Sequence, residues 1–398
     1  MLLIFAFDFS GDDVMNRKLK TALCAALVLL LTLSCCCVGF ADEPMPVTVK
    51  AKAAVLMDVG TGKVLMSMNA DEKLYPASVT KIMTLLLVTE ALDSGKITLD
   101  DTVTASSSAA SKGGSQIWLK EGEQMTVEEL LKATAVYSAN DACTALGELL
   151  AGSDEAFTAM INERARQLGM KNTHFDNCTG LDDTTATHLT TAMDVAIMSR
   201  ELLKHERITK YTTIWMDSLR GGATELVNTN KLVRFYKGTT GLKTGTTAKA
   251  GCCVSASAKR GNTHLIAVVM GSQTSDDRFN GAKAMLNWGF ANYSTVTPRI
   301  DPSLITDVAV IGGVADYVHP ALPKAASVLV KKGDEGKIRT DVELCIDVKA
   351  PVEKGQVLGK AVIRLGDEKI GEYNIIAPEA VRALTFKDIF FRLLKAFA

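Results

Sequence analysis

The sequence lacks an excess of charge of either sign. Its 44 basic and 45 acidic residues leave a formal net charge of −1 over 398 residues. Because phosphate-backbone binding needs a basic surface, this balance argues against a nucleic-acid partner. The hydrophobic share of 47% and the charged share of 22% are typical of a globular protein with a sizeable core. The length exceeds one ordinary domain and predicts two.

The cysteines lack the spacing of a metal site or of a disulfide framework. Four of the nine lie in an N-terminal apolar segment, and the five that remain are an odd number without a C-x-x-C pair. These five are Cys143, Cys178, Cys252, Cys253 and Cys345. We therefore expect small buried thiols, no metal and no cofactor.

The N-terminal apolar run is too short for an ordinary membrane span. From Met15 the sequence MNRKLKTALCAALVLLLTLSCCCVGFADEP has a basic start, an apolar run and small residues, which predicts a secretory signal peptide cut after Ala41. Residues 1–14 do not fit this pattern and indicate an upstream start that the cell does not use. A retained anchor and a lipoprotein-type site near Cys35 stay open as alternatives. Each interpretation places the rest of the chain outside the cytoplasm.

Strand patterns at both ends of residues 45–297 enclose a helical middle. Alternating apolar residues predict one hairpin over 53–69 and a second from Gly251–Ala258 and Thr263–Met270. Helices are expected near Ser78 and over 126–150, 154–168, 190–203 and 277–290. We predict an α+β fold in which the N- and C-terminal strands meet in one antiparallel sheet flanked by helices.

The last hundred residues have a different character. Short alternating segments separated by Gly, Pro and charged turns predict a small all-β domain over 299–378. The tail, 379–398, forms an amphipathic helix with phenylalanines on one side and basic residues on the other. It is too short to span a bilayer and suits a membrane surface, while docking on the protein itself stays open.

A lysine lies in the first turn of an otherwise apolar helix. Lys81 follows Ser78 by three residues, so its amine can reach the serine hydroxyl at the helix start. A buried lysine is costly unless it is paired or used, and a neutral one can activate serine as a nucleophile. Alone, the pattern also fits an N-cap serine followed by a lysine that reaches solvent.

Two further polar groups interrupt apolar surroundings. Ser138 and Asn140 lie in AVYSANDACTAL, where a hydroxyl can relay a proton and an amide can both donate and accept. Lys243, Thr244, Gly245 and Thr246 precede the second hairpin and suit the binding of a carboxylate along an edge strand. We expect Gly245 to let a substrate backbone approach closely. Local capping and a polar strand end are the simpler interpretations of each group alone.

Together, in this order, the three motifs resemble Ser-x-x-Lys, Ser-x-Asn and Lys-Thr-Gly of the serine penicillin-recognising fold. The segments YPASVTKIMTLLLV, NCTGLDD and GLKTGTTAKAGCCVSASAKRG are similar to low-molecular-weight penicillin-binding proteins, the serine-type D-alanyl-D-alanine carboxypeptidases of peptidase family S11. The resemblance covers about residues 45–398. It implies a β-lactamase-like transpeptidase fold over 45–297, followed by the β-rich domain and the tail.

The resemblance implies a role for each motif. Ser78 would attack the penultimate D-Ala carbonyl of a peptidoglycan stem peptide, with Lys81 as its base. Ser138 would carry the proton to the departing D-Ala. Substrate would be held by Asn140, Lys243, Thr244, Gly245, Thr246 and Arg278. β-Lactams would acylate Ser78, and the protein would act in cell-wall biogenesis at the outer face of the cytoplasmic membrane.

Rival functions share this fold. A class A β-lactamase needs a Glu-x-x-Leu-Asn segment, and none occurs between Ser138 and Lys243. A DD-endopeptidase that cuts cross-links stays open, as does a non-catalytic cell-wall binder, although the intact motifs favour an enzyme.

Overall fold

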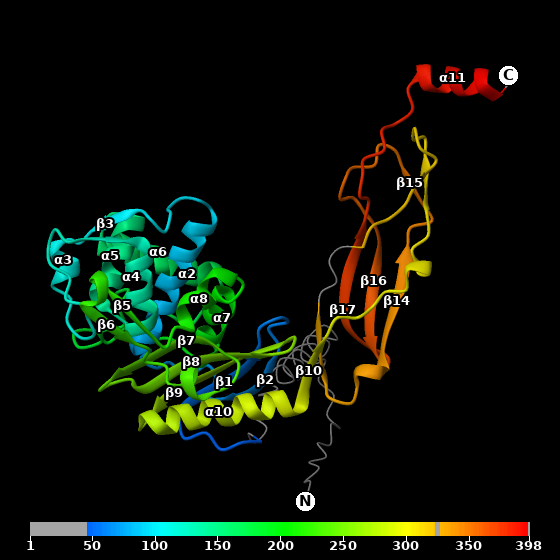
Figure 1. Ribbon diagram of the computed structural model, residues 1–398. Coiled ribbons are helices and arrows are strands. Elements are labelled where there is room, and N and C mark those ends of the chain that lie inside the picture. Colours follow the sequence, from blue (N-terminus) through cyan, green and yellow to red (C-terminus); the bar gives the residue numbers. More distant parts are fainter. Residues whose placement is uncertain (1–45, 323–326, 397–398) are drawn as a thin grey trace, which may run out of the picture. The chain divides into compact units, whose positions relative to one another are not determined.

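The computed structural model describes residues 46–322 and 327–396 of the chain. The predicted signal peptide lies outside the described residues. Figure 1 shows a sheet with helices on both faces, and a separate set of strands formed by the C-terminal residues.

The main sheet has five strands in the order β2-β1-β9-β8-β7, and every neighbouring pair is antiparallel. The strands are β1 (Ala53–Asp58), β2 (Val64–Met68), β7 (Thr239–Thr247), β8 (Gly251–Arg260) and β9 (Thr263–Ser272). Both predicted hairpins are present. β1 pairs with β9 from Ala53↔Met270 to Asp58↔Leu265, so the predicted meeting of N- and C-terminal strands is confirmed.

Strand β1 is buried along its whole length because helices cover both faces of the sheet. Since side chains alternate across a strand, its residues enter two separate hydrophobic clusters. Ala53, Val55 and Met57 join the cluster that contains α2 (Lys81–Asp93) and α7 (Ala192–Leu202). Ala54 and Leu56 join the cluster of α10 (Ser275–Asn292), which lies along the opposite face in Figure 1.

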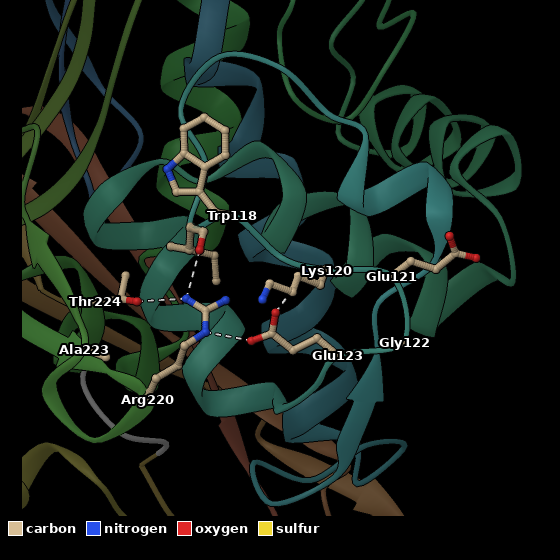
Figure 2. A pocket seen from close by; sticks show the side chains of 9 residues that line it. Trp118, Lys120, Glu121, Gly122, Glu123, Arg220, Ala223 and Thr224 are labelled. Atoms are coloured by element: carbon tan, nitrogen blue, oxygen red, sulfur yellow. Dashed lines mark hydrogen bonds and ion pairs between the residues drawn. The ribbon is translucent and has the colours of Figure 1, made fainter.

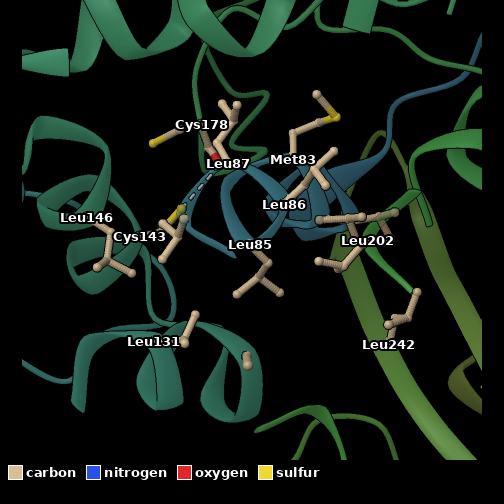
Figure 3. Packing of buried hydrophobic residues seen from close by; sticks show 14 of the residues in the cluster. Met83, Leu85, Leu86, Leu87, Leu131, Cys143, Leu146, Cys178, Leu202 and Leu242 are labelled. Atoms are coloured by element: carbon tan, nitrogen blue, oxygen red, sulfur yellow. Dashed lines mark hydrogen bonds between the residues drawn. The ribbon is translucent and has the colours of Figure 1, made fainter. Parts of the chain in front are cut away.

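Helix α2 has apolar residues on every side, and nearly all of them are buried against neighbouring helices and strands. Figure 3 shows its Leu85, Leu86 and Leu87 among side chains from neighbouring helices and strands, including Leu146 and Leu202. Each fully buried leucine contributes about 1.5–3 kcal/mol through the hydrophobic effect. A short 3-10 turn, Ala77–Thr80, precedes α2 and contains Ser78.

The helix predicted over 126–150 is wrong as one continuous element. Strand β4 (Gln124–Thr126) leads into α4 (Val127–Lys132), a π-helical turn (Ala133–Tyr137) and then α5 (Asn140–Ala151). Ser138 separates the two helices because its backbone is left-handed, with φ 68° and ψ 27°. The predicted capping box of Thr126 and Glu129 is present at the start of α4.

The other helices and strands before residue 293 are short, except for the 14-residue α6. They are β3 (Thr102–Thr104), α3 (Ser107–Ala110), α6 (Asp154–Gln167), α8 (Thr209–Thr212), β5 (Met216–Leu219), β6 (Thr224–Val227) and α9 (Leu232–Phe235), with 3-10 turns at Glu206–Ile208 and Arg220–Gly222.

The C-terminal residues form three small sheets, as the predicted all-β domain requires. Their strands are β10 (Tyr293–Val296), β11 (Val308–Ile311), β12 (Tyr317–Val318), β13 (Val328–Lys331), β14 (Ile338–Leu344), β15 (Asp347–Lys349), β16 (Val357–Leu365) and β17 (Glu368–Ile376). The first of them begins before the predicted boundary at 299. The chain ends in α11 (Phe386–Ala396), and no helix in the described ranges is long and apolar enough to cross a membrane.

Candidate active site

Ser78 and Lys81 meet at the start of α2. The Nζ of Lys81 lies 3.0 Å from the Oγ of Ser78 and donates a hydrogen bond to the backbone oxygen of Thr179 at 2.7 Å. Lys81 has no exposed surface, whereas Ser78 is half-buried and can be reached by a ligand. The helix start therefore presents a hydroxyl whose immediate neighbour is a buried amine.

Burial lowers the pKa of the Lys81 amine, because desolvation disfavours its charged form. Cys143, Cys178 and Asp141 oppose this effect more weakly. A lysine whose pKa is lowered is neutral more of the time, and only the neutral amine can accept a proton from the serine.

Two glycines fix the turn that carries Ser78. A Cβ on Gly180, at φ 88°, would lie 1.9 Å from the backbone oxygen of Ala77, and one on Gly245 would lie 2.7 Å from the oxygen of Pro76. Gly245 was expected to make room for a substrate backbone. The structure adds a second reason for this glycine, because its missing side chain makes room for the turn that carries Ser78, in which Ala77 has a strained φ of 50°.

Asn177, which the sequence analysis did not single out, holds the turn that points the carbonyl of Thr179 at Lys81. Oδ1 of Asn177 accepts hydrogen bonds from the N–H of Thr179 at 3.1 Å, the hydroxyl of Thr179 at 3.0 Å and the N–H of Gly180 at 2.7 Å. Nδ2 of Asn177 donates to the oxygen of Leu181 at 2.8 Å. This turn lies within NCTGLDD, a segment that was noted only for its family resemblance.

Ser138 and Asn140 lie at the break between α4 and α5. Nδ2 of Asn140 donates to the oxygen of Gly113 at 2.6 Å, and its backbone N–H donates to the oxygen of Ser115 at 2.7 Å. Oδ1 of Asn140 is buried and has no partner among the described residues. Because buried polar atoms are normally paired, this oxygen is suited to accept an N–H from a ligand.

Lys243 and Thr244 lie on β7, in the same strand segment as Gly245. Lys243 is wholly buried, and its Nζ donates to the backbone oxygen of Thr244 at 3.0 Å. Burial lowers the pKa of Lys243 well below its usual value, and repulsion from Lys81 and Arg278 adds to the effect. The hydroxyl of Thr244 donates to the hydroxyl of Thr229 at 2.7 Å.

Arg278 supports the exposed end of this segment from α10. Its Nη1 donates to the hydroxyl of Thr246 at 2.9 Å, to the oxygen of Gly245 at 3.0 Å and to the oxygen of Cys253 at 3.2 Å. Burial lowers the pKa of Arg278, and its Nε is buried without a partner in the described chain. Thr246 itself is exposed and can contact a ligand.

The arrangement suits acyl transfer. A hydroxyl lies beside a buried amine, and an open amide acceptor lies in the Ser138–Asn140 turn. The buried Lys243 lies on β7, and Arg278 contacts the same strand from α10. Within the described ranges, no group of three or more His, Cys, Asp or Glu side chains could hold a metal ion.

A family profile described as D-alanyl-D-alanine carboxypeptidase matches residues 40–274, and one described as penicillin-binding protein 5, C-terminal domain, matches residues 293–383. The D-alanyl-D-alanine carboxypeptidase DacF of Bacillus subtilis is 41% identical over 376 residues, covering 94% of this chain and 96% of that protein.

Solved structures are also similar. Penicillin-binding protein 5 from Haemophilus influenzae has a TM-score of 0.73 at 32% identity, covering 85% of this chain and 100% of that chain. Penicillin-binding protein D2 from Listeria monocytogenes, solved in a cefotaxime-bound form, has a TM-score of 0.57 at 31% identity and covers 62% of this chain and 100% of that chain.

Proposed function

The chain belongs to the D-alanyl-D-alanine carboxypeptidase family, and we propose that it removes the terminal D-alanine from peptidoglycan stem peptides through an acyl-enzyme on Ser78. The observation that carries this proposal is the 3.0 Å approach of the buried Lys81 amine to the Ser78 hydroxyl. A nucleophile and its base must lie within such a distance for proton transfer.

In the first half-reaction, the Ser78 proton passes to the neutral amine of Lys81 while Oγ attacks the carbonyl carbon of the penultimate D-Ala. The tetrahedral adduct collapses, the C–N bond breaks, and Ser138 relays a proton to the departing D-Ala amine. In the second half-reaction, water gives one proton to the neutral Lys81 amine as its oxygen adds to the ester carbonyl, and this proton passes to the Oγ of Ser78 as the C–O bond breaks. The reaction consumes one water and releases one D-alanine and the shortened peptide.

The other residues bind and orient the substrate. The free Oδ1 of Asn140 accepts the N–H of the substrate amide, and the backbone N–H groups of Ser78 and Thr246 stabilise the developing oxyanion. Lys243, Thr244 and Thr246 bind the terminal carboxylate. Arg278 orients the Thr246 hydroxyl, to which it donates a hydrogen bond.

A β-lactam presents a reactive carbonyl to the same residues. We propose that it acylates Ser78 and is released slowly, in keeping with the cefotaxime-bound form of the Listeria monocytogenes relative. Intact-mass spectrometry after benzylpenicillin treatment tests this step. Wild type should gain the mass of one drug molecule, and Ser78→Ala should gain none. An unmodified wild-type protein would favour a non-catalytic binder.

We also propose an exported, peripheral location. Residues 1–41 serve as the upstream segment and signal peptide, 45–297 as the catalytic domain, 299–378 as the β-rich domain and 379–398 as a membrane-surface tail. The support for the tail is the exposure of its apolar side chains: Phe386 is 84% exposed, and Phe390, Leu393 and Leu394 are 51–55% exposed. Such a row, opposite basic residues, suits the interface of a bilayer.

A further inference from the structure

An exposed tryptophan is held in a strained conformation beside the candidate active site. Trp118 has a φ of 61° and is 73% exposed, whereas its neighbours Ile117 and Leu119 are buried. The carboxylate of Asp141 accepts the N–H of Ile117 at 3.2 Å and the N–H of Leu119 at 3.0 Å. The chain on both sides of the indole is therefore fixed, and a large apolar side chain is kept in solvent.

Trp118 borders a pocket of about 660 Å³ between the 117–123 segment and the tip of the β5–β6 hairpin. Figure 2 shows the guanidinium of Arg220 at its centre. Arg220 donates to Glu123 at 2.7 Å, to the oxygen of Ile117 at 2.9 Å and to the hydroxyl of Thr224 at 2.8 Å. Its Nη2 is buried and has no partner within the described chain.

Backbone strain gathers at only a few places in the described residues. Five non-glycine residues have a positive φ: Asn69, Ala77, Trp118, Ser138 and Arg220. Ala77 precedes Ser78, Ser138 is itself a candidate catalytic residue, and Trp118 and Arg220 both line this pocket. Such conformations cost about 1–3 kcal/mol each and cluster at functional sites, so the pocket shares a property with the active site.

The segment that carries Trp118 is hydrogen-bonded to the start of α5, where Asn140 lies. Gly113 and Ser115 hydrogen-bond to Asn140, the proposed substrate-amide acceptor, and Asp141 fixes Trp118 from the next position along the chain. The 113–119 segment therefore connects the hydrogen-bond partners of Asn140 to the Trp118 indole.

The chemistry of the lining favours a neutral ligand rich in hydroxyl groups. Two basic side chains, Lys120 and Arg220, are balanced by Glu121 and Glu123, and Arg220 is already paired with Glu123, so a carboxylate gains little. A sugar hydroxyl can both donate and accept, which matches a lining of carboxylate, guanidinium and threonine hydroxyl groups. The flat indole offers an apolar surface for one face of a pyranose ring.

We propose that this pocket is a second binding subsite, which takes an N-acetylhexosamine ring of the glycan strand to which the stem peptide is attached. The inference rests on the proposed function, because it takes peptidoglycan as the substrate. It predicts that the protein prefers stem peptides that carry their sugars over free peptides.

Direct binding tests the subsite without turnover. The probe is the peptide-free disaccharide of N-acetylglucosamine and N-acetylmuramic acid, with its lactyl carboxyl blocked as the methylamide so that the probe is neutral, titrated into the Ser78→Ala protein by calorimetry. Adding Trp118→Ala should weaken binding roughly 3- to 10-fold, the size expected for one lost aromatic contact. Adding Tyr317→Ala, which removes another exposed aromatic, should leave the affinity unchanged. Trp118 is exposed, and equal melting temperatures of the variants check that the fold is intact.

Three outcomes overturn the subsite: no saturable binding of the disaccharide at millimolar concentration, equal affinity with and without the Trp118 indole, or Trp118-dependent binding of the sugar-free stem tripeptide instead. A kinetic readout separates this failure from that of the proposed function. The ratio of kcat/KM for the disaccharide-pentapeptide over the free pentapeptide should fall about 3- to 10-fold in Trp118→Ala. If wild type cleaves neither substrate, the proposed function itself fails. If it cleaves both and the ratio is unchanged, only the subsite fails.

Discussion

The backbone oxygen of Thr179 lies 2.7 Å from the Nζ of Lys81. A carbonyl can only accept, so it holds one N–H of the lysine whether the amine is charged or neutral. The position of Nζ near Ser78 is therefore fixed by a loop that lies 98 residues further along the chain. This contact links the NCTGLDD segment to Lys81 and through it to Ser78, the proposed nucleophile.

Asn177→Ala should slow acylation because Asn177 aims the Thr179 carbonyl. Three acceptor contacts of its Oδ1 are lost, and Thr179 can turn away from Lys81. We expect the second-order rate constant for acylation by a fluorescent penicillin to fall roughly 10-fold, the size of about 1.4 kcal/mol. Asn177→Asp keeps the acceptor and should recover part of the rate, with the acidic limb of the pH profile moved to higher pH because the added negative charge raises the pKa of Lys81. A recovered rate with an unmoved limb would argue against a contact through Lys81.

Lys81→Met should stabilise the protein and abolish its activity. Burial of the amine is unfavourable for its charged form, whereas methionine fills a similar volume without that cost. We expect a higher melting temperature and a loss of acylation of about 10²- to 10⁴-fold, the range for a general base. Retained acylation in a folded Lys81→Met protein would exclude Lys81 as the base.

The pH dependence of stability follows from two buried histidines. Burial lowers the pKa of His188 and of His264 to about 4 from an unperturbed 6.5. In the folded state, Nδ1 of His188 accepts the N–H of Asp176 at 3.0 Å. A proton on Nδ1 would point at this N–H, and the hydrogen bond would be lost. Below pH 6.5 the unfolded chain binds protons that the folded chain does not bind until near pH 4. The free energy of unfolding should therefore fall as the pH falls through this window, by up to about 3 kcal/mol for His188.

Urea denaturation between pH 4 and pH 7 measures this slope. His188→Gln should flatten it, whereas His319→Gln, which removes an exposed imidazole, should leave it unchanged. The same slope in all three proteins would show that His188 is protonated equally in the folded and unfolded states.

Gly180→Ala should damage both stability and acylation. The new Cβ would meet the backbone oxygen of Ala77 at 1.9 Å, next to Ser78, at a backbone φ of 88°. Gly95→Ala is the matched control, since Gly95 has a φ of 72° but nothing within 4 Å of its added Cβ. We expect about 1 kcal/mol of destabilisation for Gly95→Ala from backbone conformation alone and clearly more for Gly180→Ala. Equal losses of stability, with equal acylation, would contradict the contact.

The proposed membrane binding by α11 requires its exposed apolar side chains. Phe390→Asp with Leu394→Asp should abolish sedimentation of the full chain with anionic lipid vesicles. Ile346→Asp is the control, because Ile346 is 92% exposed but lies outside the helix. If the double variant still sediments with vesicles, the tail does not bind the membrane as proposed.

Local sequence patterns predicted those helices and strands in which apolar residues recur at a regular spacing. The hairpins and the helix near Ser78 follow from alternation and from a long apolar run, and the β1–β9 pairing follows from the placement of strands at both ends. The break at Ser138 could not be predicted, because its left-handed backbone interrupts a segment that is apolar on both sides. Propensity alone favours a continuous helix there.

The candidate site, like the fold, could be predicted from the sequence only in part. The three motifs were visible because each is short and its spacing has a chemical meaning, and the roles given to their residues stay a prediction. Asn177 and Trp118 could not be predicted, because their roles depend on contacts between residues that are far apart in the sequence. Asn177 orients Thr179, whose carbonyl binds Lys81, and Asp141 fixes the backbone beside Trp118. The packing of Gly245 against the turn at Pro76–Ser78 could not be predicted either, because that turn lies far away in the sequence, and the expected approach of a substrate backbone to Gly245 stays a prediction.

The central claim is that Ser78, activated by Lys81, cleaves a terminal D-alanine. Its most direct test is the release of free D-alanine from a synthetic acyl-D-Ala-D-Ala peptide by wild type and by Ser78→Ala at matched concentrations. The account predicts continuous release by wild type and none above background by Ser78→Ala. Equal release by both proteins, or no release by a folded wild type, would contradict it.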